Sequence, residues 1–180
     1  MVVIVQKEHK VLRKKAKEVA LSKITSPEIK KIISDLKKAL ASQLDGVAIA
    51  APQINVSLRV FVVSGKIFMA LSRSKKSEDK PLKNMPDRVY INPSFVKQSK
   101  DKAWMEEGCL SVRYLYGRAE RSKKVRMKAY DEKGKAIEVG ASGLLAQIFQ
   151  HESDHLDGVL FIDKAKDVVE LTPDEYYGHK

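Results

Sequence analysis

The feature that most constrains the fold is an apolar helical pattern that leads directly into a pair of histidines. Residues 151–155 read His-Glu-Ser-Asp-His, and Gly158 follows as a helix end. Residues four apart on a helix share one face, so both imidazoles can reach one metal ion. The sequence therefore predicts a half-buried helix that carries two metal ligands, with Glu152 beside the first. The apolar residues that precede it at helical spacing are Leu144, Leu145, Ile148 and Phe149.

A catalytic ion needs a third protein ligand and an open position for water. Downstream of the histidines the chain offers Glu170 and Glu175 in a polar stretch, and position 161 is Phe where an extended zinc motif has a third His. Cys109, the only cysteine, lies upstream beside Gly108, and a thiolate suits a borderline or soft divalent ion. Taken alone, Cys109 reads as a buried core thiol and the histidine pair as a solvated helix face.

The rest of the chain predicts one α+β domain over residues 1–180, with antiparallel β-sheets packed around a central helix that carries the histidine pair. An N-terminal amphipathic helix is expected to begin at Ser26-Pro27 and to end at Gly46. Its apolar positions are Ile29, Ile32, Ile33, Leu36, Leu40 and Leu44. Strands are expected at 59–64, at 88–92 before Pro93, and at 123–130 with a hairpin return at 136–139; residues 72–87 are expected to form a loop.

The formal net charge is +11, with basic residues spread over 10–17, 30–38, 73–83 and 118–128. Such a surface favours polyanions, although a solvated lysine-rich surface is the plainer explanation. No apolar run approaches the roughly 20 residues that span a bilayer, and the first residues lack the apolar core of a secretory signal. We therefore expect a cytoplasmic protein that does not enter a membrane.

Three segments resemble the three motifs of peptide deformylases, in the family's order. Residues 46–53 are similar to G-x-G-x-A-A-x-Q, residues 107–111 stand as E-G-C-L-S, and residues 151–158 stand as H-E-x-D-H-L-x-G. The likeness covers residues 8–165 and includes the opening segment VLRKKAKEV. Three matched motifs are far more specific than one.

The resemblance implies a metal-dependent hydrolase that removes the N-formyl group from the N-terminal formylmethionine of newly made polypeptides and releases formate. It implies that Cys109, His151 and His155 hold one divalent ion. Ferrous iron is the ion expected from the family, with zinc, nickel or cobalt as alternatives. Glu152 would act as general base and then as acid, while the Gln53 amide and the Leu110 backbone N–H would stabilise the oxyanion.

Further expectations follow from the same resemblance. Asp154 would orient a histidine or would simply be an exposed helix carboxylate. The expected partners are formylmethionyl nascent peptides and, through the basic surface, the ribosome; a monomer is expected. For Leu144 and Ile148, plain core packing is an alternative to substrate contact. The residues expected to line the substrate site are Gly46, Val47, Ala48, Gly108, Leu144 and Ile148.

Four departures from the family pattern stand out. Ala48 replaces the usual second glycine of the first motif, and we expect its methyl to strain the loop if that position needs a positive φ. Arg113 stands where proline is common, residues 66–87 are longer than in compact members, and the C-terminal LTPDEYYGHK lacks a long basic helix.

Three other functions are compatible with parts of the pattern. A zinc peptidase that cuts internal bonds would keep its metal without Cys109. A cysteine hydrolase that uses Cys109 as nucleophile would survive chelation. A basic RNA-binding or ribosome-binding protein with a vestigial site would bind RNA in a salt-sensitive way without turnover.

Overall fold

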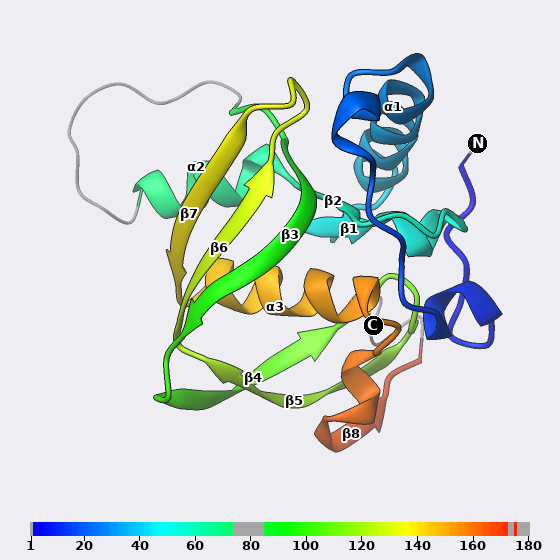
Figure 1. Cartoon of the computed structure of the whole chain (residues 1–180). Helices are drawn as coiled ribbons and strands as arrows, with labels where there is room; N and C mark the ends of the chain where they lie inside the picture. The colour runs from blue at the N-terminus through cyan, green and yellow to red at the C-terminus, as the bar shows by residue number, and fades with distance from the viewer. Residues whose placement is uncertain (1, 74–84, 173–174, 176–180) are drawn as a thin grey trace.

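The computed structural model describes residues 2–73, 85–172 and 175, and the described part is an α+β fold in which two antiparallel sheets flank one helix (Figure 1). The larger sheet has the order β1-β2-β3-β6-β7 and the smaller the order β4-β5-β8. The helices are α1 (Pro27–Ala41), α2 (Gly65–Arg73) and α3 (Leu144–Leu156). The strands are β1 (Ala48–Ala50), β2 (Val60–Val63), β3 (Arg88–Gln98), β4 (Lys102–Gly108), β5 (Leu115–Ser122), β6 (Lys124–Tyr130), β7 (Ala136–Ser142) and β8 (Lys166–Glu170).

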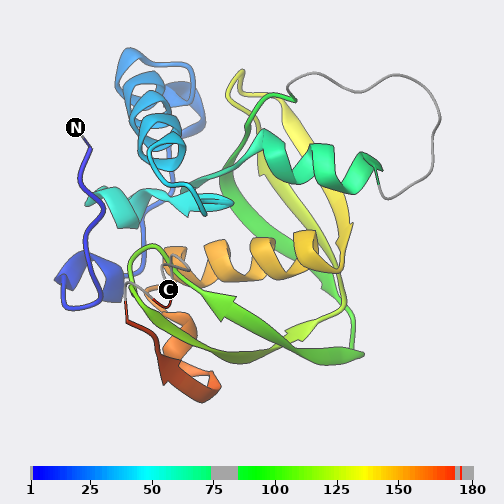
Figure 2. The same cartoon turned by 180° about the vertical axis from the view of Figure 1, so that it is seen from behind.

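Helix α3 runs between the two sheets, and both views show it enclosed on opposite sides by β4-β5 and by the larger sheet (Figures 1 and 2). Its inner face packs on an aromatic cluster in which the rings of Tyr90 and Phe149 are 5.0 Å apart and those of Phe61 and Tyr90 also 5.0 Å apart. Fully buried aromatic side chains of this kind each contribute about 1.5–3 kcal/mol through burial. The packing therefore holds α3 firmly beside the sheet.

Strand β2 is buried on both faces, because a helix covers each side of the sheet at this point. Phe61 and Val63 join the core that contacts α3, whereas Val60 and Val62 join the core beneath α1. All four residues are completely buried. A strand between two helical layers reads as a continuous apolar run, which is why VFVV predicts it well.

The predicted antiparallel α+β arrangement is confirmed, but several boundaries are wrong. Helix α1 begins after the N-cap Ser26, yet it ends at Ala41 rather than at Gly46, and Leu44 is 89% exposed. The hydroxyl of Ser42 donates to the Ala39 carbonyl at 2.7 Å. This side-chain hydrogen bond competes with continuation of the helix.

Pro93 does not end β3, which continues to Gln98. The pairing with β6 shifts register between Ile91 and Ser94, and Asn92 has a φ of 51°. Proline is tolerated at such an irregularity because no ladder hydrogen bond is lost there.

Five labelled helices and strands were not predicted: α2 and strands β1, β4, β5 and β8. Part of the expected 72–87 loop is helical, since α2 runs to Arg73 and buries Ile67 and Phe68. The remainder of that loop at 74–84, and most of the C-terminal LTPDEYYGHK, lie outside the described residues. Strands β4 and β5 carry charges on both faces, which hides the alternation that marks a strand.

Candidate metal centre

Three metal-ligating side chains converge at the inner face of α3. One ligand atom from each of Cys109, His151 and His155 lies within 4.8 Å of the others, and Cys109 Sγ is 3.1 Å from His155 Nε2. The two imidazoles come from successive turns of α3, with ring centroids 5.0 Å apart and planes at 76°. Cys109 lies in the turn that follows β4. The fold therefore brings a thiol from one sheet to the histidine pair of the helix.

The donor set fits a borderline or soft divalent ion. Burial lowers the pKa of His155 well below its usual value, so this imidazole is neutral and can offer one nitrogen lone pair to an ion. Tetrahedral sites of three nitrogen or sulfur ligands keep a fourth position for water or substrate. Cys109, His151 and Glu152 line a pocket of about 320 Å³, from which water or substrate would reach such a position.

A buried carboxylate orients His151. Glu107 Oε2 lies 3.0 Å from His151 Nδ1. Because an ionised carboxylate only accepts hydrogen bonds, Nδ1–H must donate, so Nε2 on the side of the cluster is the nitrogen that would lose its proton to bind an ion. Arg121 in turn donates to both oxygens of Glu107, at 2.7 and 2.9 Å.

These contacts control the charge of Glu107. Burial by itself raises its pKa, but the hydrogen bonds from Arg121 and His151 outweigh that and lower the pKa to about 2. Burial by itself lowers the pKa of His151, but the hydrogen bonds with Cys109 and Glu107 outweigh it and raise the pKa well above its usual value. Sequence reasoning missed Glu107 and Arg121 as parts of the site; the only signal was that Glu107 belongs to the E-G-C-L-S segment.

Glu152 lies beside the ligands and is almost fully buried. Its Oε2 has no hydrogen-bond partner among the described residues. Burial is the largest influence on this carboxyl and raises its pKa to about 7. A carboxyl group with this pKa can accept and return a proton near neutral pH.

The amide of Gln53 is held by three contacts. Its Oε1 accepts from the Ala50 N–H at 2.8 Å, and its Nε2 lies 3.1 Å from Ser111 Oγ and 3.6 Å from Cys109 Sγ. The amide N–H group is thereby directed at the thiol side of the pocket. Leu110 lines the same pocket, and its backbone N–H donates none of the hydrogen bonds found among the described residues.

The structure places five of the six expected substrate residues on this pocket and one elsewhere. Val47, Ala48, Gly108, Leu144 and Ile148 line it, whereas Gly46 lines a separate hollow with Leu40 and Ser64.

Ala48 does not strain the chain, because the positive φ on which that expectation depended is not found at this position. It lies in extended β1 paired with Val63, and it is not among the described residues with positive φ. Ala48 is only 5% exposed, and it belongs to the core cluster that packs against α3.

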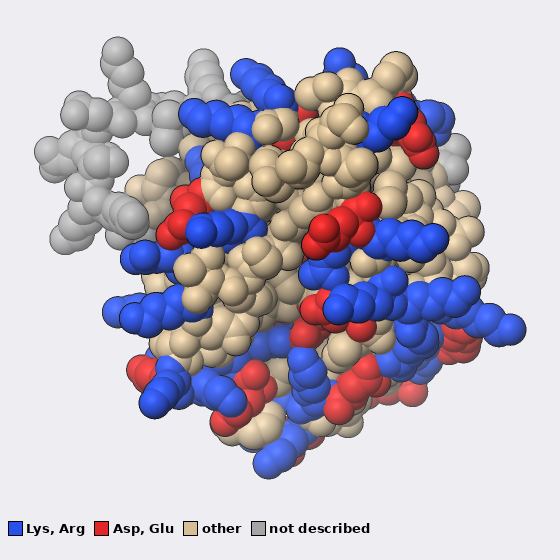
Figure 3. Space-filling model, in the orientation of Figure 1, with Lys and Arg blue, Asp and Glu red and all other residues tan. Residues whose placement is uncertain are grey.

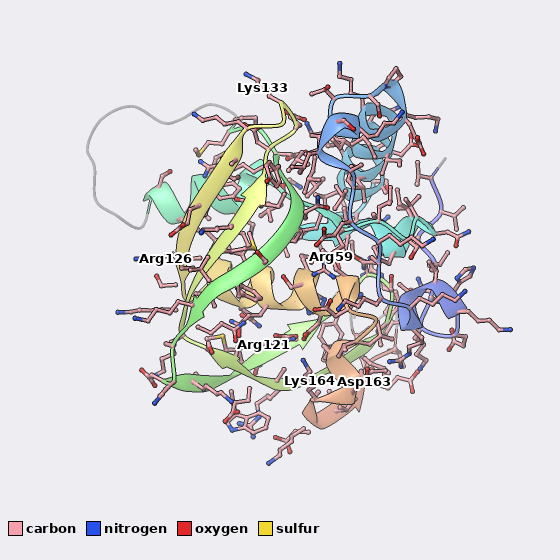
Figure 4. The ribbon with its side chains drawn as sticks, in the orientation of Figure 1. Arg59, Arg121, Arg126, Lys133, Asp163 and Lys164 are labelled. Atoms are coloured by element: carbon pink, nitrogen blue, oxygen red, sulfur yellow. The ribbon has the colours of Figure 1, made fainter. Side chains whose placement is uncertain are left out.

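One other expectation on the site needs correction. Asp154 does not orient a histidine: it accepts from Arg121 at 2.6 Å and from Lys164 at 2.8 Å. Figure 4 labels Arg121 and Lys164 in this region. Arg113 forms a two-pronged contact with Asp45 at 2.7 and 3.2 Å, and both residues line the pocket. Arg113 therefore ties the turn after β4 to the turn after α1.

The sequence matches the family model described as polypeptide deformylase over residues 1–170. A peptide deformylase of Desulforudis audaxviator is 40% identical over 162 residues, which are 90% of this chain and 92% of that protein. Peptide deformylase 1A, chloroplastic/mitochondrial, of Arabidopsis thaliana is 41% identical over 155 residues. That match spans 86% of this chain but only 57% of the longer plant protein.

Solved structures agree with the sequence comparison. The chain is similar to a class I type b peptide deformylase from Acinetobacter baumannii with a TM-score of 0.77 and 29% identity, covering 91% of this chain and 99% of that one. It is similar to a peptide deformylase from Thermotoga maritima with a TM-score of 0.76 and 32% identity, covering 92% of this chain and 98% of that one. No helix in the described part of the chain is long and apolar enough to cross a membrane.

Proposed function

Because this chain belongs to the polypeptide deformylase family, we propose that it hydrolyses the N-formyl group of the N-terminal formylmethionine of newly made polypeptides and releases formate. Members of this family are metal-dependent hydrolases. The observation that carries the proposal is the convergence of Cys109, His151 and His155 beside the buried Glu152, at the wall of one pocket. Since the family match extends over residues 1–170, we propose one catalytic domain.

Cys109, His151 and His155 would hold the ion, and Glu107 would keep His151 in the tautomer that can bind it. A bound divalent ion supplies Lewis-acid polarisation of the formyl carbonyl and makes water a stronger nucleophile. We propose ferrous iron as this ion, with zinc, nickel or cobalt as alternatives that the same ligand set accepts.

Glu152 would move the proton. Its carboxylate would take a proton from the attacking water and then give it to the amine nitrogen that leaves the formyl carbon. A pKa of about 7 suits both halves of this task, because base and acid forms are then both populated at neutral pH. The unpartnered Oε2 leaves that oxygen available for the transfer.

Gln53 and Leu110 would stabilise the oxyanion that develops on the formyl oxygen. The Gln53 amide is already oriented by Ala50 and Ser111, so little reorganisation accompanies the reaction. A preorganised donor of this kind typically contributes about 3 kcal/mol to transition-state stabilisation. The apolar walls Val47, Leu144 and Ile148 would receive the methionine side chain.

The decisive experiment measures formate release from formyl-Met-Ala-Ser by protein purified without oxygen, before and after chelation. Bound metal is counted in the wild type, in Cys109→Ala and in the matched control Ser153→Ala, which alters the same helix without removing a ligand. We expect chelation to abolish turnover, Cys109→Ala to lose the metal, and Ser153→Ala to keep both.

Other outcomes separate the competing functions. Turnover that survives chelation would support a cysteine hydrolase, and a fully metallated Cys109→Ala would support a peptidase with another third ligand. Glu170 is a poor candidate for that ligand, since it lies in exposed β8 and is not part of the cluster. Metal binding without formate release would contradict the proposed reaction. A cytoplasmic location, a monomeric state and contact with the ribosome stay predictions.

A further inference from the structure

The exposed face of the larger sheet carries a row of cations away from the pocket. We call Lys97, Lys124, Arg126 and Lys128 the basic face. Lys124, Arg126 and Lys128 alternate along β6 with the buried Val125 and Met127, so all three point outward. Alternate residues of a strand repeat about every 6.8 Å, which gives the row a regular spacing. Figure 3 shows Lys and Arg side chains gathered along this side, at the left of the view, and Figure 4 labels Arg126 there.

These cations are poorly compensated within the described part of the chain. Lys97 of β3 stands directly opposite Arg126 of β6, and like charges at opposed positions destabilise a sheet. Glu138 of β7 is an acidic neighbour, and its carboxylate lies 3.6 Å from Arg126 and 3.9 Å from Lys128. One negative charge is therefore shared between two cations. Neither Lys97 nor Lys124 forms an ion pair with a described residue.

The surface between these cations is hollowed rather than filled. A depression of about 530 Å³ is lined by Lys97, Lys124 and Arg126. Gly140 is paired with Arg126, and a Cβ atom there would meet nothing within 4 Å. The position opposite the guanidinium is therefore open space. The other lining residues include Ser99 and Ser142, whose side chains are small and polar.

We propose that the basic face binds the phosphodiester backbone of RNA. A regular row of cations beside an open hollow complements the evenly spaced negative charges of a nucleic-acid strand, and the net charge of +11 attracts such a strand from a distance. The hollow has no aromatic lining residue on which a base could stack. Binding through phosphates alone positions an RNA without reading its sequence.

This surface is separate from the catalytic pocket, since the two share no lining residue. RNA bound to the sheet would leave the pocket open to a peptide. The inference therefore does not depend on the proposed deformylase activity, and either can fail while the other stands.

The test titrates the full, metal-loaded protein into a fluorescently labelled single-stranded RNA over a range of salt concentrations. The variant combines Lys97→Gln, Lys124→Gln and Arg126→Gln. The control removes the same charge from the exposed side chains of Lys10, Lys14 and Lys15, which lie in and next to the first helical turn at the opposite side of the molecule (Figures 1 and 2). Circular dichroism and urea unfolding report whether each variant is folded.

We expect the basic-face variant to bind RNA roughly tenfold or more weakly. The slope of log affinity against log salt concentration should become shallower by about two, because each of the three lost phosphate contacts contributes ~0.7 on a single strand. The control should change both values little, and the circular dichroism spectrum should be the same in all three proteins. RNA of scrambled sequence should bind equally well. Equal losses in the two variants would overturn the proposal, because the effect would then belong to the general charge. Tighter binding of polyglutamate or of anionic vesicles through the same residues would also overturn it.

Discussion

Glu107 and His151 are joined by a hydrogen bond of 3.0 Å, and this carboxylate is shared with the buried guanidinium of Arg121. Arg121 also contacts Asp154, which lies on α3 between the two histidines. One arginine of β5 thus links the strand that precedes Cys109 to the helix that carries the other two ligands. The metal-binding geometry depends on this link between a sheet and a helix.

Replacing Glu107 with Gln should weaken metal binding by about 10–100-fold. The amide can still contact His151, but it no longer balances Arg121 or strengthens the imidazole as a ligand. Competition with a calibrated chelator measures the change. Glu120→Gln in neighbouring β5 is the matched control, because its carboxylate pairs with exposed Lys102. Identical competition curves for both variants would show that Glu107 does not tune the site.

Replacing Glu152 with Gln should lower kcat by on the order of 10²–10⁴ while metal content stays unchanged. The amide keeps the size of the side chain but cannot carry a proton. Steady-state formate release together with metal analysis separates these effects. Asp157→Asn at the end of the same helix, whose carboxylate pairs with Arg59 at 2.7 Å, should remain active. A Glu152→Gln enzyme that turns over normally would exclude Glu152 as the proton carrier.

Replacing Ala48 with Gly should destabilise the protein by about 1–2 kcal/mol without a gain in kcat/KM. The substitution removes a buried methyl group and adds backbone freedom to the unfolded chain. Urea unfolding measures the stability. Ala136→Gly in exposed β7 should cost less, since only the backbone contribution applies there. A clear rise in kcat/KM would mean that the methyl obstructs substrate after all.

Acid should destabilise the metal-free protein through Glu107. The pKa of this group is about 2 in the folded chain against an ordinary value of 4.5. A folded pKa below the unfolded one contributes stability that is present above the unfolded pKa and is lost as pH falls toward the folded pKa. The free energy of unfolding should therefore fall between pH 4.5 and about 2.

Urea unfolding at a series of pH values compares the wild type with Glu107→Gln. The variant should be less stable at neutral pH and should lose less stability across that acid range. Parallel curves for the two proteins would show that another carboxylate accounts for the acid sensitivity.

Much of the fold could be predicted where neighbouring residues dominate the local structure. The apolar run VFVV and the alternating KVRMKAY correspond to β2 and β6, and Ser26-Pro27 marks the start of α1. Strands β4 and β5 escaped prediction because tertiary contacts neutralise their inward charges. Arg121 and Glu107 face the core as an ion pair, so neither strand shows an apolar face in sequence.

The sequence by itself determined the chemistry that is available: one thiol, a histidine pair four residues apart, and two carboxyl residues, Glu152 and Asp154, between them. Helical periodicity is local, so it sets which side chains share a face whatever surrounds the helix. Only the tertiary structure decided which groups support them. In the folded chain Glu107 contacts His151, and Asp154 accepts a hydrogen bond from Arg121 rather than from a histidine. Ala48 lies in a strand. These contacts join residues distant in sequence, and they follow from sheet register and helix packing that no local spacing encodes.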